Sequence, residues 1–285
     1  MANFSLAAFT DEYASDFAKQ IEGMQKNGIK YTEIRGVNGK NICHLTTDEV
    51  KEAKRMLDAN GLATWSVGSP LGKIQLLEDD IYEHLDTCKR IYEAANILQT
   101  PNIRMFSFFV PDTANIGQYR SQVMEYLHMM LEAARPYGVT LCHENEKDIY
   151  GAKPEGVLEI MKEFEGEIKC IFDPANFIQE DVTTYPDAYE QLKEHIYYMH
   201  IKDCHESKWV VPAGVGVGRI PEILADLNKR DETITLTLEP HLCLFDGLKE
   251  LERETVTSII PTYKTSEEAF GAATDALKGI LANLK

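Results

Sequence analysis

Apolar and polar positions follow two periods along the chain, and segments of the two kinds succeed each other from end to end. Short apolar runs predict strands, and apolar residues three or four positions apart predict amphipathic helices between them. Alternation of this kind is typical of a parallel sheet. The predicted strands are residues 5–10, 31–36, 63–68, 102–108, 139–144, 169–174, 197–202 and 234–239. Eight strand-helix units are the number that closes a (β/α)8 TIM barrel, an α/β fold.

Helix boundaries are also marked in the sequence. Thr46 and Glu49 have the spacing of a capping box and predict the start of the second helix. Gly28 and Gly61 follow helical stretches and precede strands, where a left-handed residue is commonly needed. The clearest apolar helix faces consist of Phe17, Ile21 and Met24; of Val123, Tyr126, Leu127, Met130 and Leu131; and of Val157, Ile160, Met161 and Phe164.

The domain organisation is expected to be simple. No low-complexity linker or break in composition divides the chain, so we predict a single domain over residues 1–285. A doubly wound open sheet is the competing architecture, but a phosphate-binding GxGxxG should then follow the first strand, where TDEYASDF stands. The glycines of GVGVGR, residues 214–219, follow a polar loop and are a weak signal. The one long irregular stretch covers about residues 244–264.

Composition restricts the class of partner. The chain has 46 acidic and 29 basic residues and a formal net charge of −17, which opposes loose binding to nucleic acid or anionic lipid. Its six cysteines form no CxxC pair, so neither a zinc knuckle nor a disulfide framework is predicted. Residues 1–30 do not resemble a signal peptide, and no stretch is long and apolar enough for a membrane helix. We expect a soluble, cytoplasmic protein; a homo-oligomer or a partner subunit stays open.

Polar residues follow the last four predicted strands at the end where a barrel places its chemistry. Glu144, Asp173, His200 and Glu239 each end an apolar run. Residues two apart in a strand share a face, so each of these residues should point into the barrel mouth above an inward-facing neighbour. Those neighbours are Cys142, Ile171, Tyr198 and Thr237.

A metal ion would explain this convergence. Three carboxylates in one place repel each other unless a cation neutralises them, and a divalent ion with three oxygen ligands and one imidazole nitrogen does so. A single acidic residue at a strand end is more often a solvated loop residue or a helix cap. Donors from Glu, Asp and His without Cys favour Mn²⁺, with Mg²⁺, Co²⁺ and Zn²⁺ as alternatives.

The segments LCHENE, IFDPANF, MHIKD and LTLEP, in this order on successive strands, resemble the xylose isomerase-like TIM-barrel superfamily, the sugar phosphate isomerase/epimerase group. FTDEY, EIRGVNGKNI and GSPLGKI extend the resemblance to nearly the whole chain. The resemblance implies that Glu144, Asp173, His200 and Glu239 bind the metal and that Glu144 and Glu239 are the acid/base pair. Several ketose epimerases of the family have His where this chain has Asn176, and Arg where it continues KDCHESK. These departures count against ketose epimerase activity in particular.

Further residues near these strand ends are candidate contacts for substrate. We predict such roles for Glu33, Lys73, Asn176 and Lys202, with Lys73 suited to a phosphate or carboxylate. Strand alternation turns His143 away from the metal toward the helices, although a strand that has already ended would let it face the substrate and act in catalysis. Arg35 is a further candidate at the same mouth, and Glu146 could reach the site or cap the following turn. His205 and His241 are candidate extra ligands or substrate contacts, and Trp65, Phe106 and Phe108 are expected in the core.

The leading functional hypothesis is a metal-dependent sugar or sugar phosphate isomerase or epimerase that transfers a proton next to a carbonyl through an enediolate. Two glutamates on opposite faces of the substrate suit that reaction. A lyase that expels the aglycone from a 3-oxo-glycoside is the alternative, with a histidine such as His143 as base. An endonuclease IV-like phosphodiesterase would need more histidine ligands and a basic groove, which the net charge disfavours.

Overall fold

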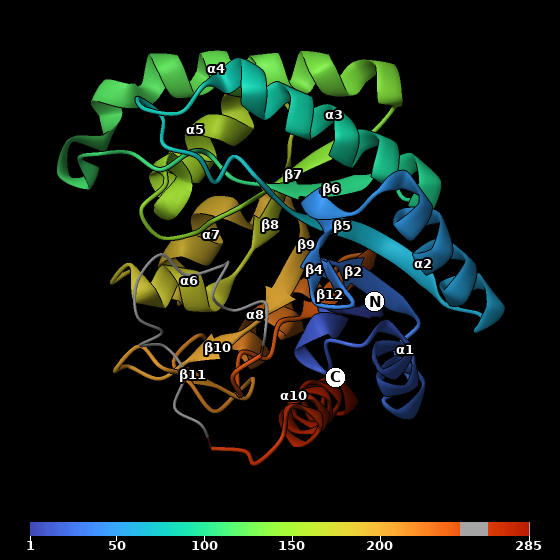
Figure 1. Cartoon of the computed structure of the whole chain (residues 1–285). Helices are drawn as coiled ribbons and strands as arrows, with labels where there is room; N and C mark the ends of the chain where they lie inside the picture. Colours follow the sequence, from blue (N-terminus) through green and yellow to red (C-terminus); the bar gives the residue numbers. More distant parts are fainter. Residues whose placement is uncertain (246–261, 285) are drawn as a thin grey trace.

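The computed structural model describes residues 1–245 and 262–284, and eight parallel strands form a closed barrel at its centre (Figure 1). Hydrogen bonding between the first strand and the last closes the barrel. The predicted (β/α)8 fold and all eight predicted strands are confirmed. In chain order the barrel strands are β1 (Asn3–Ala8), β2 (Tyr31–Ile34), β5 (Ala63–Leu71), β6 (Asn102–Met105), β7 (Thr140–Glu144), β8 (Lys169–Phe172), β9 (Ile196–Ile201) and β12 (Thr233–Leu238).

Helices surround the barrel. The predicted capping box is confirmed, since the side chains of Thr46 and Glu49 bond reciprocally at the start of α2. Gly28 and Gly61 have the predicted positive φ, at 63° and 68°. The described α-helices are α1 (Phe17–Lys26), α2 (Thr47–Ala59), α3 (Ile81–Leu98), α4 (Arg120–Ala134), α5 (Pro154–Glu163), α6 (Pro174–Gln179), α7 (Tyr189–Leu192), α8 (Ile220–Leu227) and α10 (Ser266–Ala282).

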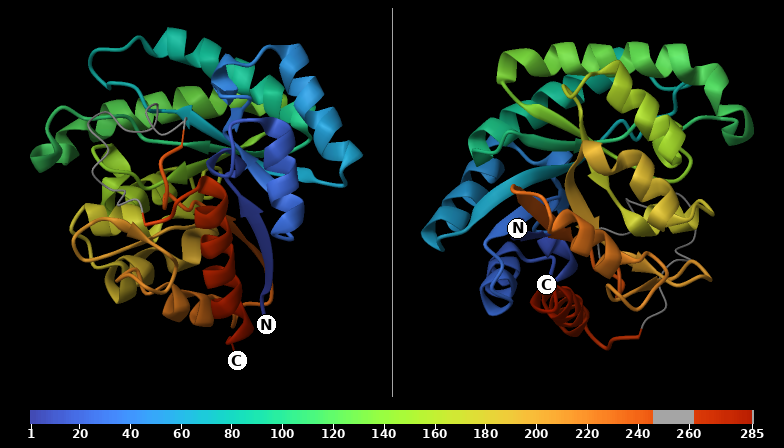
Figure 2. Two further views of the ribbon diagram at one scale, coloured as in Figure 1. Left: turned by 60° about the horizontal axis from the view of Figure 1, so that its bottom comes forward. Right: turned by 180° about the vertical axis from the view of Figure 1, so that it is seen from behind.

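The last helix returns to the start of the chain. α10 lies beside α1 and the first strand (Figure 2). The rings of Tyr13 and Phe270 meet edge to face with centroids 5.5 Å apart, and Lys278 Nζ donates to the carbonyl oxygen of Asn27 at 2.6 Å. These contacts attach the C-terminal helix to the N-terminal unit of the barrel.

Some boundaries differ from the predictions. β6 ends at Met105 rather than at Phe108, because the chain turns there to follow the end of β5: the amides of Phe106 and Phe108 donate to the carbonyl oxygens of Leu71 and Gly72 at 2.8 and 3.0 Å. Most of the predicted irregular stretch lies outside the described residues. Two short antiparallel pairs were not predicted, namely β3 (Gly36–Val37) with β4 (Lys40–Asn41) and β10 (Asp203–Cys204) with β11 (Val210–Val211).

Strand alternation sorts side chains between the barrel interior and the helix layer. Cys142, Ile171 and Tyr198 form one buried cluster inside the barrel, with Trp65 packed against it. Phe108 belongs instead to the main core between strands and helices. The residues two positions after the interior cluster therefore reach the carboxyl ends of the strands with their side chains inward.

The glycines of residues 214–218 surround a carboxylate. Asp203 Oδ2 accepts from the amides of Gly214 and Gly216 at 2.8 and 3.1 Å, and Oδ1 accepts from Gly218 and Cys204 at 2.9 and 2.8 Å. Backbone amides arranged in this way form an anion-binding nest. The glycines of GVGVGR, a weak indication of a phosphate site, thus bind the carboxylate of Asp203 instead. These hydrogen bonds anchor the segment directly after Lys202.

Gly216→Ala is expected to destabilise the protein by about 1–3 kcal/mol. A Cβ at this position would collide with the Cys204 carbonyl oxygen and the Asp203 carboxylate, neither of which can move without breaking the nest. Thermal unfolding measures the effect. Gly279→Ala in α10 is the matched control, because its Cβ would meet no atom within 4 Å and alanine favours the helix. Equal stability of the two variants would contradict this account.

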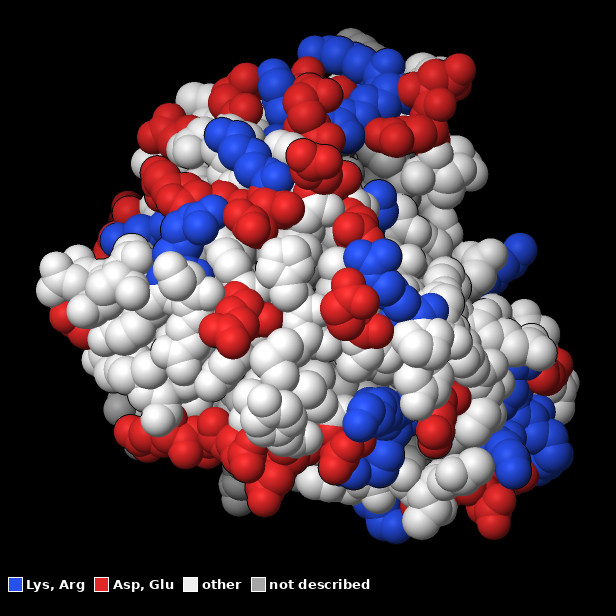
Figure 3. Space-filling view, turned by 90° about the horizontal axis from the view of Figure 1, so that it is seen from above, with Lys and Arg blue, Asp and Glu red and all other residues white. Residues whose placement is uncertain are grey.

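The surface carries charges of both signs. On the face above α3 and α4, Lys and Arg side chains alternate with Asp and Glu and do not gather into a basic patch (Figure 3). Arg120, the first residue of α4, pairs with Glu163 at 2.9 Å, and Arg135, directly after α4, pairs with Glu167 at 2.9 Å. Within the described residues, no helix combines the length and apolar character that crossing a membrane requires. The six cysteines, all within the described residues, form no disulfide bond.

Candidate functional site

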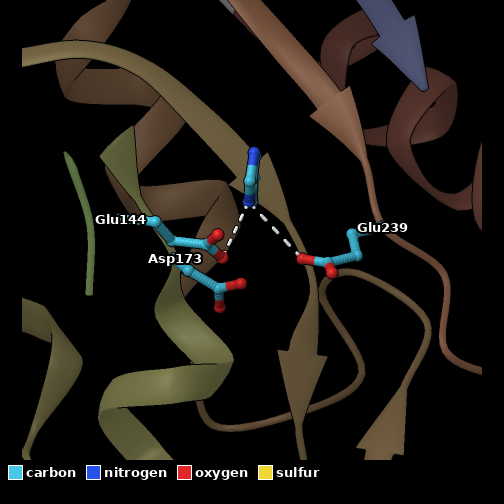
Figure 4. Close-up of side chains that lie close together, drawn as sticks. Glu144, Asp173 and Glu239 are labelled. Carbon is cyan, nitrogen blue, oxygen red and sulfur yellow. Dashed lines mark hydrogen bonds and ion pairs between the residues drawn. The ribbon is translucent and has the colours of Figure 1, made fainter. Parts of the chain in front are cut away.

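Four side chains singled out in the sequence lie together at the carboxyl ends of four consecutive barrel strands. Glu144 ends β7, Asp173 follows β8, His200 lies in β9 and Glu239 follows β12. One donor atom from each lies within 4.8 Å of the others, and all four residues are buried. The carboxylates of Glu144, Asp173 and Glu239 point toward a common centre (Figure 4).

Glu144 is held by three neighbours. Its Oε2 accepts from Arg104 Nη1 at 3.1 Å, and its Oε1 lies 2.9 Å from His200 Nδ1 and 3.3 Å from Asn176 Nδ2. Arg104 lies in β6, the strand beside β7, and its side chain is also buried. The buried carboxylate after the apolar run of β7 is therefore balanced by a guanidinium from the neighbouring strand.

Both ring nitrogens of His200 face carboxylates. Nδ1 lies 2.9 Å from Glu144 Oε1 and 3.4 Å from Glu239 Oε2, while Nε2 lies 3.2 Å from Glu33 Oε2. Burial disfavours the charged ring, but the neighbouring Glu144 and Glu33 raise the pKa of His200 well above its ordinary value. Glu33 also accepts from the Tyr198 hydroxyl at 2.9 Å. Nδ1 is thus the nitrogen on the side of the carboxylate cluster, and Glu33 holds the opposite side of the ring.

Asp173 begins α6 as its N-cap. Its Oδ1 accepts from the Asn176 amide at 3.0 Å. Asn145 bonds the Asp173 backbone twice, through its Oδ1 and Nδ2, each at 2.9 Å. Asp173 Oδ2 lies 2.9 Å from Lys202 Nζ but accepts no well-aligned hydrogen bond. The segments HENE (143–146) and DPAN (173–176) are therefore hydrogen-bonded to each other. Asp173 Oδ2 is left as a buried carboxylate oxygen directed at the cluster.

Glu239 connects the cluster to a second group of charges. Its Oε2 lies 3.1 Å from Lys202 Nζ, and its Oε1 lies 3.4 Å from Arg35 Nη1. Burial would raise the pKa of Glu239, but Lys202, His241 and His200 hold it well below its usual range. Glu12, Glu239 and His241 also lie close enough to share a cation. Arg35 already lies 3.1 Å from Glu12 and serves as that cation.

The donor set fits a divalent metal ion. Bonds of about 2.1 Å require donors within about 4.2 Å of each other, so the four side chains need shift by less than about 1 Å. Asp173 Oδ2 supplies a buried acceptor without a hydrogen bond. Carboxylates also outnumber cationic side chains around the cluster: Asp11, Glu12, Glu33, Glu144, Glu146, Asp173 and Glu239 against Arg35, Lys73, Arg104 and Lys202. The ammonium of Lys202 would compete with such an ion for Asp173 and Glu239, two of the four cluster residues.

Lys202→Met is expected to increase the affinity for Mn²⁺ by about tenfold or more, because a hydrogen bond to a charged group contributes about 1.5–3 kcal/mol. The metal-free variant should also unfold at a lower temperature, since Asp173 and Glu239 lose a buried partner. Titration with Mn²⁺ against a chelator and thermal unfolding in EDTA measure the two effects. Lys73→Met is the control, because Lys73 pairs with Glu146 and with none of the four cluster residues. Weaker Mn²⁺ binding by Lys202→Met would contradict the inference that Lys202 competes with the metal ion for Asp173 and Glu239.

The other predicted residues occupy three environments. His143 lies on the opposite face of β7, where its Nε2 bonds Ser107 Oγ at 2.9 Å. Burial lowers the pKa of His143 to about 4. Lys73 pairs with Glu146 at 2.9 Å beside the cluster. His205 stacks on Trp209 in the β10–β11 hairpin, with ring centroids 4.3 Å apart. Lys73, Glu146 and Lys202 thus lie near each other, and His143 and His205 lie elsewhere.

Two charged residues of the site were missed in the sequence. Arg104 lies between Ile103 and Met105 in a predicted strand, and a charged residue within such an apolar run is itself a signal of an internal ion pair. Glu12, in the FTDEY segment, bonds the His241 amide through Oε2 at 2.6 Å and pairs with Arg35. Burial raises the pKa of Glu12 to about 8, with Arg35 opposing the shift. No spacing rule connects Glu12 with residues more than 200 positions away.

Comparisons with known proteins agree with the barrel fold. Over 98% or more of both chains, the fold matches the IOLI protein with a bound zinc atom (16% identity, TM-score 0.75) and a probable 3-DHS dehydratase, AsbF, from Bacillus anthracis (16%, 0.71). It also matches 3-keto-D-glucoside 4-epimerase, YcjR, from E. coli (15%, 0.67), over 99% of this chain and 100% of that one. No curated protein matches the sequence. The model of the xylose isomerase-like TIM barrel family matches residues 21–255, and the chain belongs to that family.

Proposed function

We propose that this protein is a divalent-metal-dependent sugar isomerase or epimerase and that residues 1–285 act as one domain. The observation that carries the proposal is the buried convergence of Glu144, Asp173, His200 and Glu239 at the strand ends. Three carboxylates and one imidazole suit Mn²⁺ best, with Mg²⁺, Co²⁺ or Zn²⁺ as alternatives. The named relatives include an epimerase and a protein with bound zinc, which is consistent with a metal-dependent reaction on a sugar.

The proposed reaction moves a proton between a carbon next to a carbonyl and a glutamate. Glu144 and Glu239 come from β7 and from the end of β12, so they approach the centre from different strands. One removes the carbon-bound proton to give an enediolate, and the other returns a proton. A bound divalent ion would polarise the carbonyl and stabilise the negative charge that develops on its oxygen. Asp173 and His200 complete the proposed ligand set.

Neighbouring side chains occupy the carboxylate oxygens of the two glutamates. Each has both carboxylate oxygens in polar contacts, Glu144 with Arg104 and His200, and Glu239 with Arg35 and Lys202. At Glu239 such contacts favour the ionised form, which can accept a proton but is a weak base. A catalytic role therefore requires one oxygen to exchange its protein contact for the substrate's carbon-bound hydrogen. Lys202 has the position to bond the oxygen or hydroxyl next to that carbon.

The residues predicted to contact the substrate lie in two places around the cluster. Lys73 and Lys202 lie on the Glu146 side of the cluster, where a substrate hydroxyl could reach them. Glu33 and Asn176 bond His200 and Glu144 directly. We propose that Glu33 and Asn176 act mainly by orienting these two side chains, as carboxylates and amides behind metal-binding residues commonly do.

The experiment that tests the function is solvent exchange. The protein, loaded with Mn²⁺, is incubated in D2O with a panel of ketoses, aldoses and their phosphates, and deuterium next to the carbonyl is followed by NMR. We expect incorporation into at least one sugar and its loss in EDTA. Exchange that persists in EDTA, or no exchange with any of the four candidate metals, would refute the proposal.

Elimination is the second candidate reaction. The predicted lyase needs a histidine base, and His143 lies against Ser107 on the helix side of β7, whereas His241 lies 3.5 Å from Glu239. A relative acts on a 3-keto-glucoside, as its name states, which gives the substrate of this alternative some support. Release of the aglycone from a 3-oxo-glycoside, measured beside deuterium exchange, separates the lyase from the isomerase. The phosphodiesterase alternative needs further histidine ligands, and His205 lies in the hairpin rather than at the cluster.

A further inference from the structure

Every cationic side chain that the described residues bring to the cluster is already paired with a carboxylate. The pairs are buried or nearly so, and the most exposed member, Glu146, is 16% exposed. Their shortest nitrogen–oxygen distances are 2.9 Å for Lys73 with Glu146, 2.9 Å for Lys202 with Asp173, 3.1 Å for Arg104 with Glu144, and 2.9 Å for Arg35 with Asp11.

The charge balance leaves no free positive charge in this region. Seven carboxyl groups surround four Lys and Arg side chains, and each of these cationic side chains already has a carboxylate partner. A phosphate dianion would add two negative charges to a site from which water is largely excluded, where repulsion between like charges is strong. An uncharged ligand meets no such cost.

Lys73 is the residue that the sequence suggested for binding a phosphate, but contacts with its neighbours already hold its ammonium in place. Its ammonium lies 4.4 Å from the centre of the Phe106 ring, as well as 2.9 Å from Glu146 Oε2. Glu146 is fixed in turn, because its Oε1 accepts from the Lys147 amide at 3.0 Å. A carboxylate and an ammonium held side by side offer an acceptor and a donor, which is what a hydroxyl group needs, since it can both donate and accept.

We propose that the substrate is an uncharged polyhydroxylated carbonyl compound, and that Glu146 excludes phosphate esters and sugar acids by neutralising Lys73. This inference rests on the proposed sugar chemistry for the class of substrate, but the exclusion of phosphate is a property of the charge pairs themselves. It therefore predicts a gain of anion binding when the Glu146 charge is removed.

The first test titrates inorganic phosphate into metal-free protein by calorimetry. Wild-type protein should show no saturable binding up to about 10 mM phosphate, a limit that corresponds to less than about 3 kcal/mol of binding free energy. Glu146→Gln, which leaves Lys73 without its carboxylate, should bind phosphate with a Kd at least about tenfold below that limit. Glu190→Gln is the matched control, because it frees the surface Lys193 by the same change far from the cluster. Saturable binding by wild type, or no gain in Glu146→Gln, would overturn the proposal.

The second test uses the sugar panel and does not depend on how the variant folds. Deuterium exchange should occur into one or more uncharged sugars and not into the matching phosphate esters. Exchange into a phosphate ester but not its parent sugar would overturn this inference while leaving the isomerase or epimerase proposal intact. Exchange into no compound would refute that proposed function, and the phosphate titration would still decide whether Glu146 excludes anions.

Discussion

Glu144→Gln and Glu239→Gln are each expected to slow deuterium exchange into the substrate by roughly 10²-fold or more, the usual effect of losing a general base. Glutamine keeps the size of the side chain and one oxygen acceptor, but it cannot take up the proton. Both glutamates are also proposed metal ligands, so Mn²⁺ content must be measured in the same samples. Slow exchange in fully loaded variants would identify a loss of base rather than a loss of metal.

His143→Ala is the control for this pair. The variant should unfold at a lower temperature, because a buried ring and the partner of Ser107 are removed, but it should retain exchange. Abolished exchange in His143→Ala with fold and metal intact would mean that this imidazole takes part in the reaction. The elimination alternative would then become the better reading.

Asp173→Asn is expected to weaken Mn²⁺ binding by about 10²-fold or more, since even residues behind the ligands of a metal commonly contribute 10–100-fold. The substitution isolates the charge, because asparagine can still accept from the Asn176 amide and cap α6. Metal content after dialysis and a titration with Mn²⁺ measure the effect.

Asp16→Asn provides the matched control for Asp173→Asn. Asp16 is likewise a helix N-cap, accepting from the Lys19 amide at 2.9 Å, but it lies at the start of α1 and outside the cluster. Its variant should bind Mn²⁺ as wild type does. Similar metal affinities for all three proteins would show that Asp173 is not a ligand.

The sequence alone determined the architecture and the membership of the central cluster. Strand and helix periods are local properties, so eight strands and the capping box of α2 could be predicted from neighbouring residues. The period of two along a strand also predicted that Glu144 and His143 point in opposite directions, and the structure places them so. Because parallel strands bring their carboxyl ends together, four polar residues at those ends had to converge.

Only the tertiary structure decided how the charges pair. Arg104 reaches Glu144 across 40 positions, and Arg35 reaches Glu239 across 204. Such partners depend on the register of neighbouring strands and on the closure of β1 against β12, which no local pattern encodes. The same holds for the Asp203 carboxylate, which accepts from an amide of the glycine loop, and for Lys73. The sequence predicted that Lys73 contacts a substrate, whereas in the fold its ammonium pairs with Glu146. Buried charges must find partners, and the identity of each partner is fixed when the barrel closes.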